Sequence, residues 1–244
     1  MSSIRASASK LLDPFGKKAE RKNPAKVQWL DSDGKTQTAG PAGNDWRLRV
    51  SVAPTSGLLY RDEDNFVLFP LVADQGVIFP ITPTINVTHT AKYDSVSLTH
   101  SNYSPQFYSG SEVAAIQING DFPIQNAIEG QYLLAAIYFF RAATKMFWGN
   151  DVLAGTPPPL LYLDGYGSHY FPHVPCVLTT FTHSLLPDVD YIEVPSAGDN
   201  SKITRVPTIS SIQISLQPVY SRAKVSQFSA VDFARGDLID KGFI

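Results

Sequence analysis

Histidines are the side chains of this sequence best suited to acid–base or metal chemistry. His169 and His173 are four residues apart, a spacing that brings two imidazoles together for a metal when they lie on a helix. Pro172 and a strand-like context deny them a helical face, so we expect no metal site. The other three are isolated from one another: His89, His100 and His183. Ser101 beside His100 does not indicate a catalytic triad, because triads are assembled by the fold.

Three carboxylates could form the acid pair of a glycosidase: Asp188, Asp190 and Glu193. Apolar residues alternate with them, which is typical of a strand beside a turn. We therefore expect a structural role for these carboxylates.

Sequence motifs for common chemistries are also missing. There is no G-x-S-x-G elbow, Walker loop, H-E-x-x-H or dinucleotide-binding glycine pattern. Residues 165–167 favour a tight turn, and Cys176, the only cysteine, favours a buried small apolar side chain. Asn86 and Asn102 each begin a glycosylation-type triplet, but nothing else indicates export. We expect no catalytic, cofactor-binding or metal-ligating residue, and no enzyme.

Hydrophobic periodicity predicts a sheet-rich domain joined by hairpin connections. Period-two patterns predict strands over 46–52, 112–119, 160–163, 177–183, 189–194 and 209–220. The apolar stretch 66–79 is interrupted by Pro70 and Gly76 and predicts two short strands joined by a turn. Residues 85–108 are rich in Thr, Ser, Tyr and Asn and predict β structure without a clear core face. Gly120 and Asp121 are expected to end the strand before them.

One segment, 126–148, predicts a long α-helix. Asn126 is a suitable N-cap with Glu129 three positions later, and Gly149 is expected to end the helix. Apolar residues fill most positions from 132 to 140, so the helix should be covered on nearly every side. The covering surface could belong to the same domain or to a neighbouring subunit. The run is too short for a membrane span.

The charge is low and unevenly distributed. Only 17% of the 244 residues are charged and the net charge is −2. Residues 1–26 carry seven cations and two acids, whereas the remainder carries a net −7. This argues against a dedicated nucleic-acid binder. We expect residues 1–30 to form a basic arm and 31–244 a single domain, whose charge-poor surface is either coated with polar uncharged residues or covered.

Five blocks together resemble one family of structural proteins. In order they are 93–108 (YDSVSLTHSNYSPQFY), 118–149 (INGDFPIQNAIEGQYLLAAIYFFRAATKMFWG), 155–167 (GTPPPLLYLDGYG), 172–194 (PHVPCVLTTFTHSLLPDVDYIEV) and 203–244. Their order and spacing are similar to those of baseplate proteins of contractile-tailed bacteriophages, in particular the tail-tube-like ring proteins that initiate or cap the tail tube.

The resemblance implies a mainly β, α+β fold: a tail-tube-like β-sandwich or split barrel with one flanking helix over about 126–148. It implies a structural virion protein of the tail baseplate, assembled in the host cytoplasm as a ring homo-oligomer, most simply a hexamer. Implied partners are the tail tube protein and other hub and wedge proteins, with DNA only as cargo passing through the bore and no membrane. Residues 85–119 would pair around the ring and line the bore.

Two other classes of function stay open. A carbohydrate-binding β-sandwich would present exposed aromatics such as Tyr103, Phe107 and Tyr108 in a row. A glycan-cleaving baseplate component would need carboxylates such as Asp188 and Asp190 in a cleft.

Overall fold

The computed structural model describes residues 27–30, 36–39, 46–53, 58–61, 66–149, 153–167, 169–196 and 199–244. The arm expected over 1–30 lies outside the described residues except for Val27–Leu30. The chain divides into two compact units, Met1–Gly40 and Pro41–Ile244. In the first unit, strand β1 (Val27–Leu30) pairs antiparallel with β2 (Thr36–Ala39).

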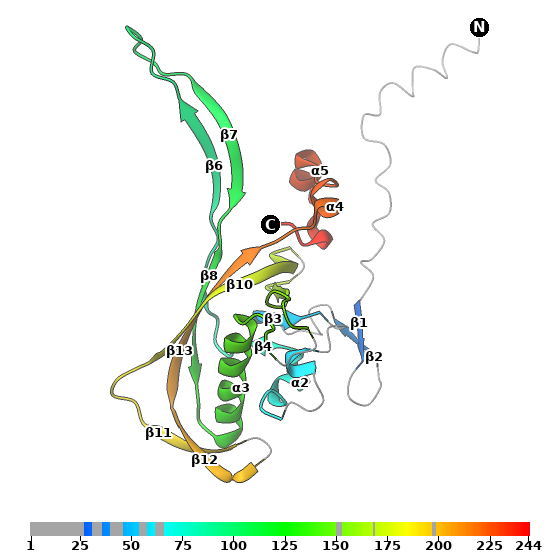
Figure 1. Cartoon of the computed structure of the whole chain (residues 1–244), viewed down its shortest axis with the longest axis vertical. Coiled ribbons are helices and arrows are strands. Elements are labelled where there is room, and N and C mark those ends of the chain that lie inside the picture. Colours follow the sequence, from blue (N-terminus) through cyan, green and yellow to red (C-terminus); the bar gives the residue numbers. More distant parts are fainter. Residues whose placement is uncertain are drawn as a thin grey trace, which may run out of the picture. The chain divides into compact units, whose positions relative to one another are not determined.

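The second unit is mainly β, as the sequence predicts, and is built on one seven-stranded antiparallel sheet (Figure 1). The strands run in the order β4-β3-β9-β10-β13-β8-β5. Their bounds are Arg49–Val52 (β3), Val77–Ile78 (β4), Thr84–Asn86 (β5), Ile116–Pro123 (β8), Leu161–Gly165 (β9), Phe171–Leu185 (β10) and Ile209–Pro218 (β13). Two further hairpins pair β6 (His89–Ser95) with β7 (Gln106–Val113), and β11 (Tyr191–Ser196) with β12 (Asp199–Pro207).

The predicted long helix is α3, Ala127–Ala143. Its start follows the sequence signal: Asn126 accepts a hydrogen bond from the Glu129 backbone N–H, and the Glu129 carboxylate accepts one from Gln125 N–H. Its end was predicted wrongly, because the helix stops before Thr144 and not at Gly149. The Thr144 hydroxyl donates to the Arg141 carbonyl, and this local bond competes with further helical turns.

The core lies between one face of the sheet and α3. Alternate residues of the strands point into it, including Val50, Leu163, Ile118 and Ile214, all fully buried. Phe140 of α3 stacks on Phe181 of β10, with ring centroids 5.5 Å apart. No helix among the described residues has the length and apolar character to cross a membrane.

Much of the second covering surface of α3 comes from the same chain. Gly130 packs against Val194 of β11, and the Gln131 side chain donates to the Pro195 carbonyl. On another side, the hydroxyl of Tyr132 accepts a hydrogen bond from Ile78 N–H of β4. An exposed stripe remains, in which Tyr138 keeps 52% of its surface.

Two local predictions were wrong. Within 66–79, Pro70–Asp74 forms a short helix, α2, because proline suits the first helical turn; only Val77–Ile78 is a strand. Gly120 does not end a strand but lies inside β8. A side chain there would overlap the ring of Phe79, so glycine is required for close packing.

The chain after β13 forms three short helical elements: the α-helices α4 (Arg222–Val225) and α5 (Ala230–Arg235) and the 3₁₀ helix Ile239–Lys241. Phe243 is buried and contacts the ring of Tyr220. Lys224 lies over both rings at 5.5 Å from each centroid. This C-terminal segment is therefore anchored by an aromatic cluster.

Candidate interaction surfaces

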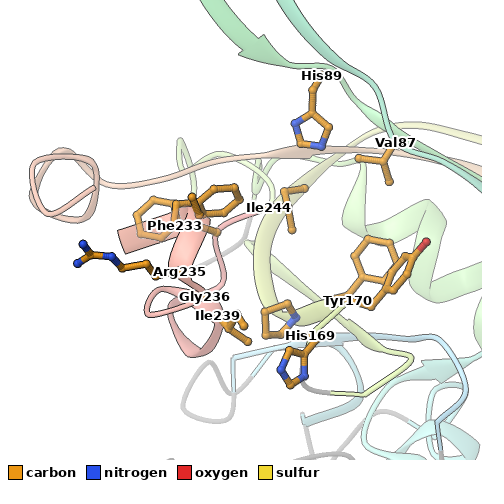
Figure 2. Close-up of a pocket in the computed structure, with 13 residues that line it drawn as sticks. Val87, His89, His169, Tyr170, Phe233, Arg235, Gly236, Ile239 and Ile244 are labelled. Carbon is orange, nitrogen blue, oxygen red and sulfur yellow. The ribbon is translucent and has the colours of Figure 1, made fainter. Parts of the chain in front are cut away.

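The two histidines considered for metal binding lie in different surroundings. His173 lies 3.2 Å from the Asp164 carboxylate through Nδ1, and its ring stacks on Tyr162 with centroids 4.1 Å apart. His169 lines a surface pocket (Figure 2). Over the described ranges, no group of three or more potential ligands could hold a metal ion.

The acidic residues and the cysteine considered for chemistry lie in a turn, at an exposed strand position and at a buried strand position. Asp188 and Asp190 lie between β10 and β11, where Asp188 has a positive φ of 61° typical of a turn. Glu193 forms an exposed ion pair with Arg205. Cys176 is fully buried, and burial raises the pKa of its thiol to about 12, which keeps it protonated and unreactive.

On β10, β13, β8 and β5, the sheet face that points away from the core forms a nearly uncharged surface, here called the uncharged face; the charged pair Arg49 and Asp164 lies on β3 and β9, outside it. Strand register aligns its side chains in three rows across β10, β13, β8 and β5. Gln117 donates to Ser215, and Ser211 donates to Asn119, so side chains of adjacent strands are hydrogen-bonded. Of the side chains in the three rows, only Asp121 is charged. The rows are Thr180–Ser215–Gln117–Asn86, Thr182–Gln213–Asn119–Thr84 and Ser184–Ser211–Asp121.

Strand β10 carries an open edge beside the uncharged face. β9 pairs with β10 only between Phe171 and Cys176, whereas β13 pairs with it from Cys176 to Leu185. Among the strands that the structure describes, none pairs with the other side of residues 177–185. Nine residues span about 30 Å and leave a row of backbone donors and acceptors available to another strand.

The hairpin of β6 and β7, residues 89–113, extends from the sheet as a ribbon (Figure 1). Its base is joined to the sheet by a hydrogen bond from the Gln217 side chain to the Val113 carbonyl. Tyr93 and Tyr108 form an edge-on cross-strand pair, and both are more than half exposed. A two-stranded ribbon is only marginally stable by itself in water, and most side chains of this one are exposed.

The three aromatics proposed for sugar binding do not form a row. Phe107 and Tyr108 are consecutive in β7 and therefore point to opposite faces of the ribbon. Tyr103 lies in the turn between the strands and is 87% exposed.

A different aromatic group was not anticipated from the sequence. Tyr166 contacts Trp46 on one side and Tyr170 on the other, with centroid separations of 5.8 and 5.7 Å. Desolvation, with the neighbouring Tyr170, raises the pKa of Tyr166. The sequence GYG at 165–167 predicted only a turn. Tyr170 comes close to Tyr166 because β9 and β10 are paired, and this pairing cannot be recognised from the GYG motif.

Two grooves meet at Tyr170 and Val87. One, of about 500 Å³, lies between the C-terminal segment and the root of the ribbon; Figure 2 shows His89 and His169 on opposite sides of it, with Arg235 pointing outward. The other, of about 720 Å³, is here called the aromatic groove. It is lined by Pro83, Ile85, Asn86, Val87, Thr88, Tyr166 and Tyr170. Neither groove is lined by the Asp188 and Asp190 carboxylates.

No protein-family model and no curated protein matches this sequence.

Proposed function

We propose that this chain is a structural subunit of a bacteriophage tail baseplate, with a tail-tube-like fold, which assembles into a ring that initiates or caps the tail tube. The observation that carries this proposal is the uncharged face. A conduit for DNA must not hold phosphates, and cations on its wall would do so. This face offers hydroxyls and amides and a single carboxylate.

The open edge supports a closed ring. Residues 177–185 of β10 can pair with a strand of a neighbouring subunit, which would satisfy the backbone groups that the chain itself leaves unpaired. Neighbouring subunits would also cover the exposed tyrosines of the ribbon. The uncharged faces of adjacent subunits would then form one continuous inner wall.

Particle mass and shape test the ring directly. The full chain is measured by light scattering across a concentration series, alone and with a tail tube protein, and imaged by negative stain. We expect closed rings, most simply hexamers, whose bore is lined by the uncharged face. A chain that stays monomeric in both settings contradicts the proposal.

The charge of the bore provides a second test. Asn119→Lys and Gln213→Lys place cations in one row of the uncharged face, and the assembled variants should retain DNA at low salt while wild-type rings do not. Gln227→Lys adds the same charge at an exposed position outside the face and should behave as wild type. Equal DNA retention by all three variants would show that this face does not line the conduit.

The basic segment 1–26 is proposed to dock on an adjacent hub or wedge protein of the baseplate. Its deletion should leave the unfolding transition of the domain unchanged and lower incorporation into particles. Unchanged incorporation would refute this part of the proposal.

A further inference from the structure

A proline-rich segment before β9 forms a preordered ridge. Residues 156–160 read TPPPL and belong to no helix or strand. Proline fixes φ near −65° and disfavours the helical region for the residue before it, so consecutive prolines favour the polyproline II conformation. Thr156 holds the start of the segment, because its N–H and its hydroxyl both donate to the Leu153 carbonyl.

The exposure pattern shows which side of this ridge faces outward. Pro157 is exposed and Leu160 keeps 38% of its surface, whereas Pro158 and Pro159 are half-buried. Polyproline II has three residues per turn, so positions three apart lie on the same side. Pro157 and Leu160 therefore form one apolar edge, here called the proline ridge.

The aromatic groove has the complementary properties. Tyr166 and Tyr170 meet at an interplanar angle of 60°, which leaves a wedge between the rings and not a flat platform. No residue lining the groove carries a charge at neutral pH, and the proline ridge is uncharged as well. Aromatic-lined grooves of this kind bind polyproline II segments, whose carbonyls lack internal hydrogen bonds and can accept from tyrosine hydroxyls or an amide such as Asn86.

We propose that the aromatic groove of one subunit binds the proline ridge of a second copy of this chain. The two surfaces cannot meet within one chain, because β9 lies between Leu160 and Tyr166. Its five residues span about 17 Å and are held in the sheet by β3 and β10. A ridge-to-groove contact is head-to-tail and generates a closed ring when the rotation closes. The inference deepens the proposed ring function and rests on it.

Disulfide trapping between full-length chains tests the contact. Leu160→Cys places a thiol on the ridge, and Thr88→Cys places one in the groove without removing an aromatic ring. Cys176 is fully buried and does not interfere. Under mild oxidation, mixing the two variants should give a covalent dimer. The control mixture of Tyr138→Cys with Thr88→Cys, where Tyr138 is an exposed residue of α3, should not.

The same assay measures how much the Tyr170 ring contributes to the contact between the two chains. Adding Tyr170→Ala to the Thr88→Cys chain should lower the dimer yield about tenfold, as expected for loss of an interface aromatic, while adding Tyr138→Ala should leave it unchanged. A dimer yield no higher than in the control mixture overturns the inference. Binding of chitohexaose that requires Tyr170, without dimer formation, would also overturn it in favour of a sugar site.

The outcomes separate this contact from the proposed function. Rings seen by negative stain without the ridge–groove disulfide would leave the ring function standing and refute the contact. A specific disulfide dimer from a chain that forms no ring with or without tube protein would support the contact and refute the ring function.

Discussion

The packing of β11 against α3 gives a quantitative prediction through Gly130 and Val194. A Cβ atom at position 130 would overlap Cγ2 of Val194. Gly130→Ala gains about 1 kcal/mol from helix propensity but overpacks the contact by about 1–3 kcal/mol. We expect a net loss near 1 kcal/mol. Val194→Ala removes two buried methyl groups at about 0.8 kcal/mol each, plus a cavity, for a loss of about 2 kcal/mol.

The double variant should be far more stable than the two losses suggest. The methyl group added by Gly130→Ala occupies the space that Val194→Ala opens, so the overpacking disappears and the gain in helix propensity remains. The expected loss is about 1 kcal/mol, a coupling of about 2 kcal/mol between the two positions.

Urea unfolding of all four proteins measures this cycle, with stability compared only where the denaturant slope is unchanged. Gly110→Ala is a useful reference, because a Cβ at this glycine has no neighbour within 4 Å. Losses that add to within about 0.5 kcal/mol would refute the reasoning, because β11 would then not cover α3 at Gly130.

Three further changes test other contacts. Tyr132→Phe removes the hydroxyl that accepts from Ile78 N–H at 2.7 Å, and should cost about 1–3 kcal/mol in urea unfolding; no change would mean that water replaces the hydroxyl. Asn126→Ala removes the N-cap of α3 and should cost about 1 kcal/mol, with loss of helical circular dichroism signal at lower denaturant, whereas Asn102→Ala in the ribbon turn should not. Burial, together with Arg141, lowers the pKa of His183 in the folded state below 6.5. The unfolded chain therefore binds the proton first, and stability should fall as the pH drops below about 6.5. His183→Gln should flatten this dependence while His100→Gln keeps it, and identical pH profiles for the two variants would contradict the assignment.

Local signals in the sequence predicted the parts of the fold that are determined locally. The α3 start was predictable because Asn126 and Glu129 interact within one turn. The strand over 209–220 was predictable because Ile212, Ile214 and Leu216 alternate with polar residues and one face is buried. Glycine misled the prediction at both Gly120 and Gly149. Gly120 lies inside β8, where Phe79 packs against it, and α3 already ends at Ala143, before Gly149 is reached.

The surfaces that carry the functional proposal depend on strand register, which one sequence does not reveal. Gln213 and Asn119 were visible as polar strand positions, but their alignment in one row follows from pairing between β13 and β8. The open edge depends on how far β9 extends along β10. The distance between Tyr166 and Tyr170 similarly follows from a turn and a register shift between Phe171 and Val174.

The exposed ribbon has a consequence for protein quality control. Its two strands pair with each other and with no other described strand, and its turn carries Leu98 and Tyr103 in solvent. Extended, accessible turns of this kind are preferred cleavage sites for proteases. In the ring proposed above, a subunit that has not found its neighbours would be cut there first, whereas an assembled subunit would be protected. We therefore expect limited proteolysis at the ribbon to distinguish orphan chains from incorporated ones.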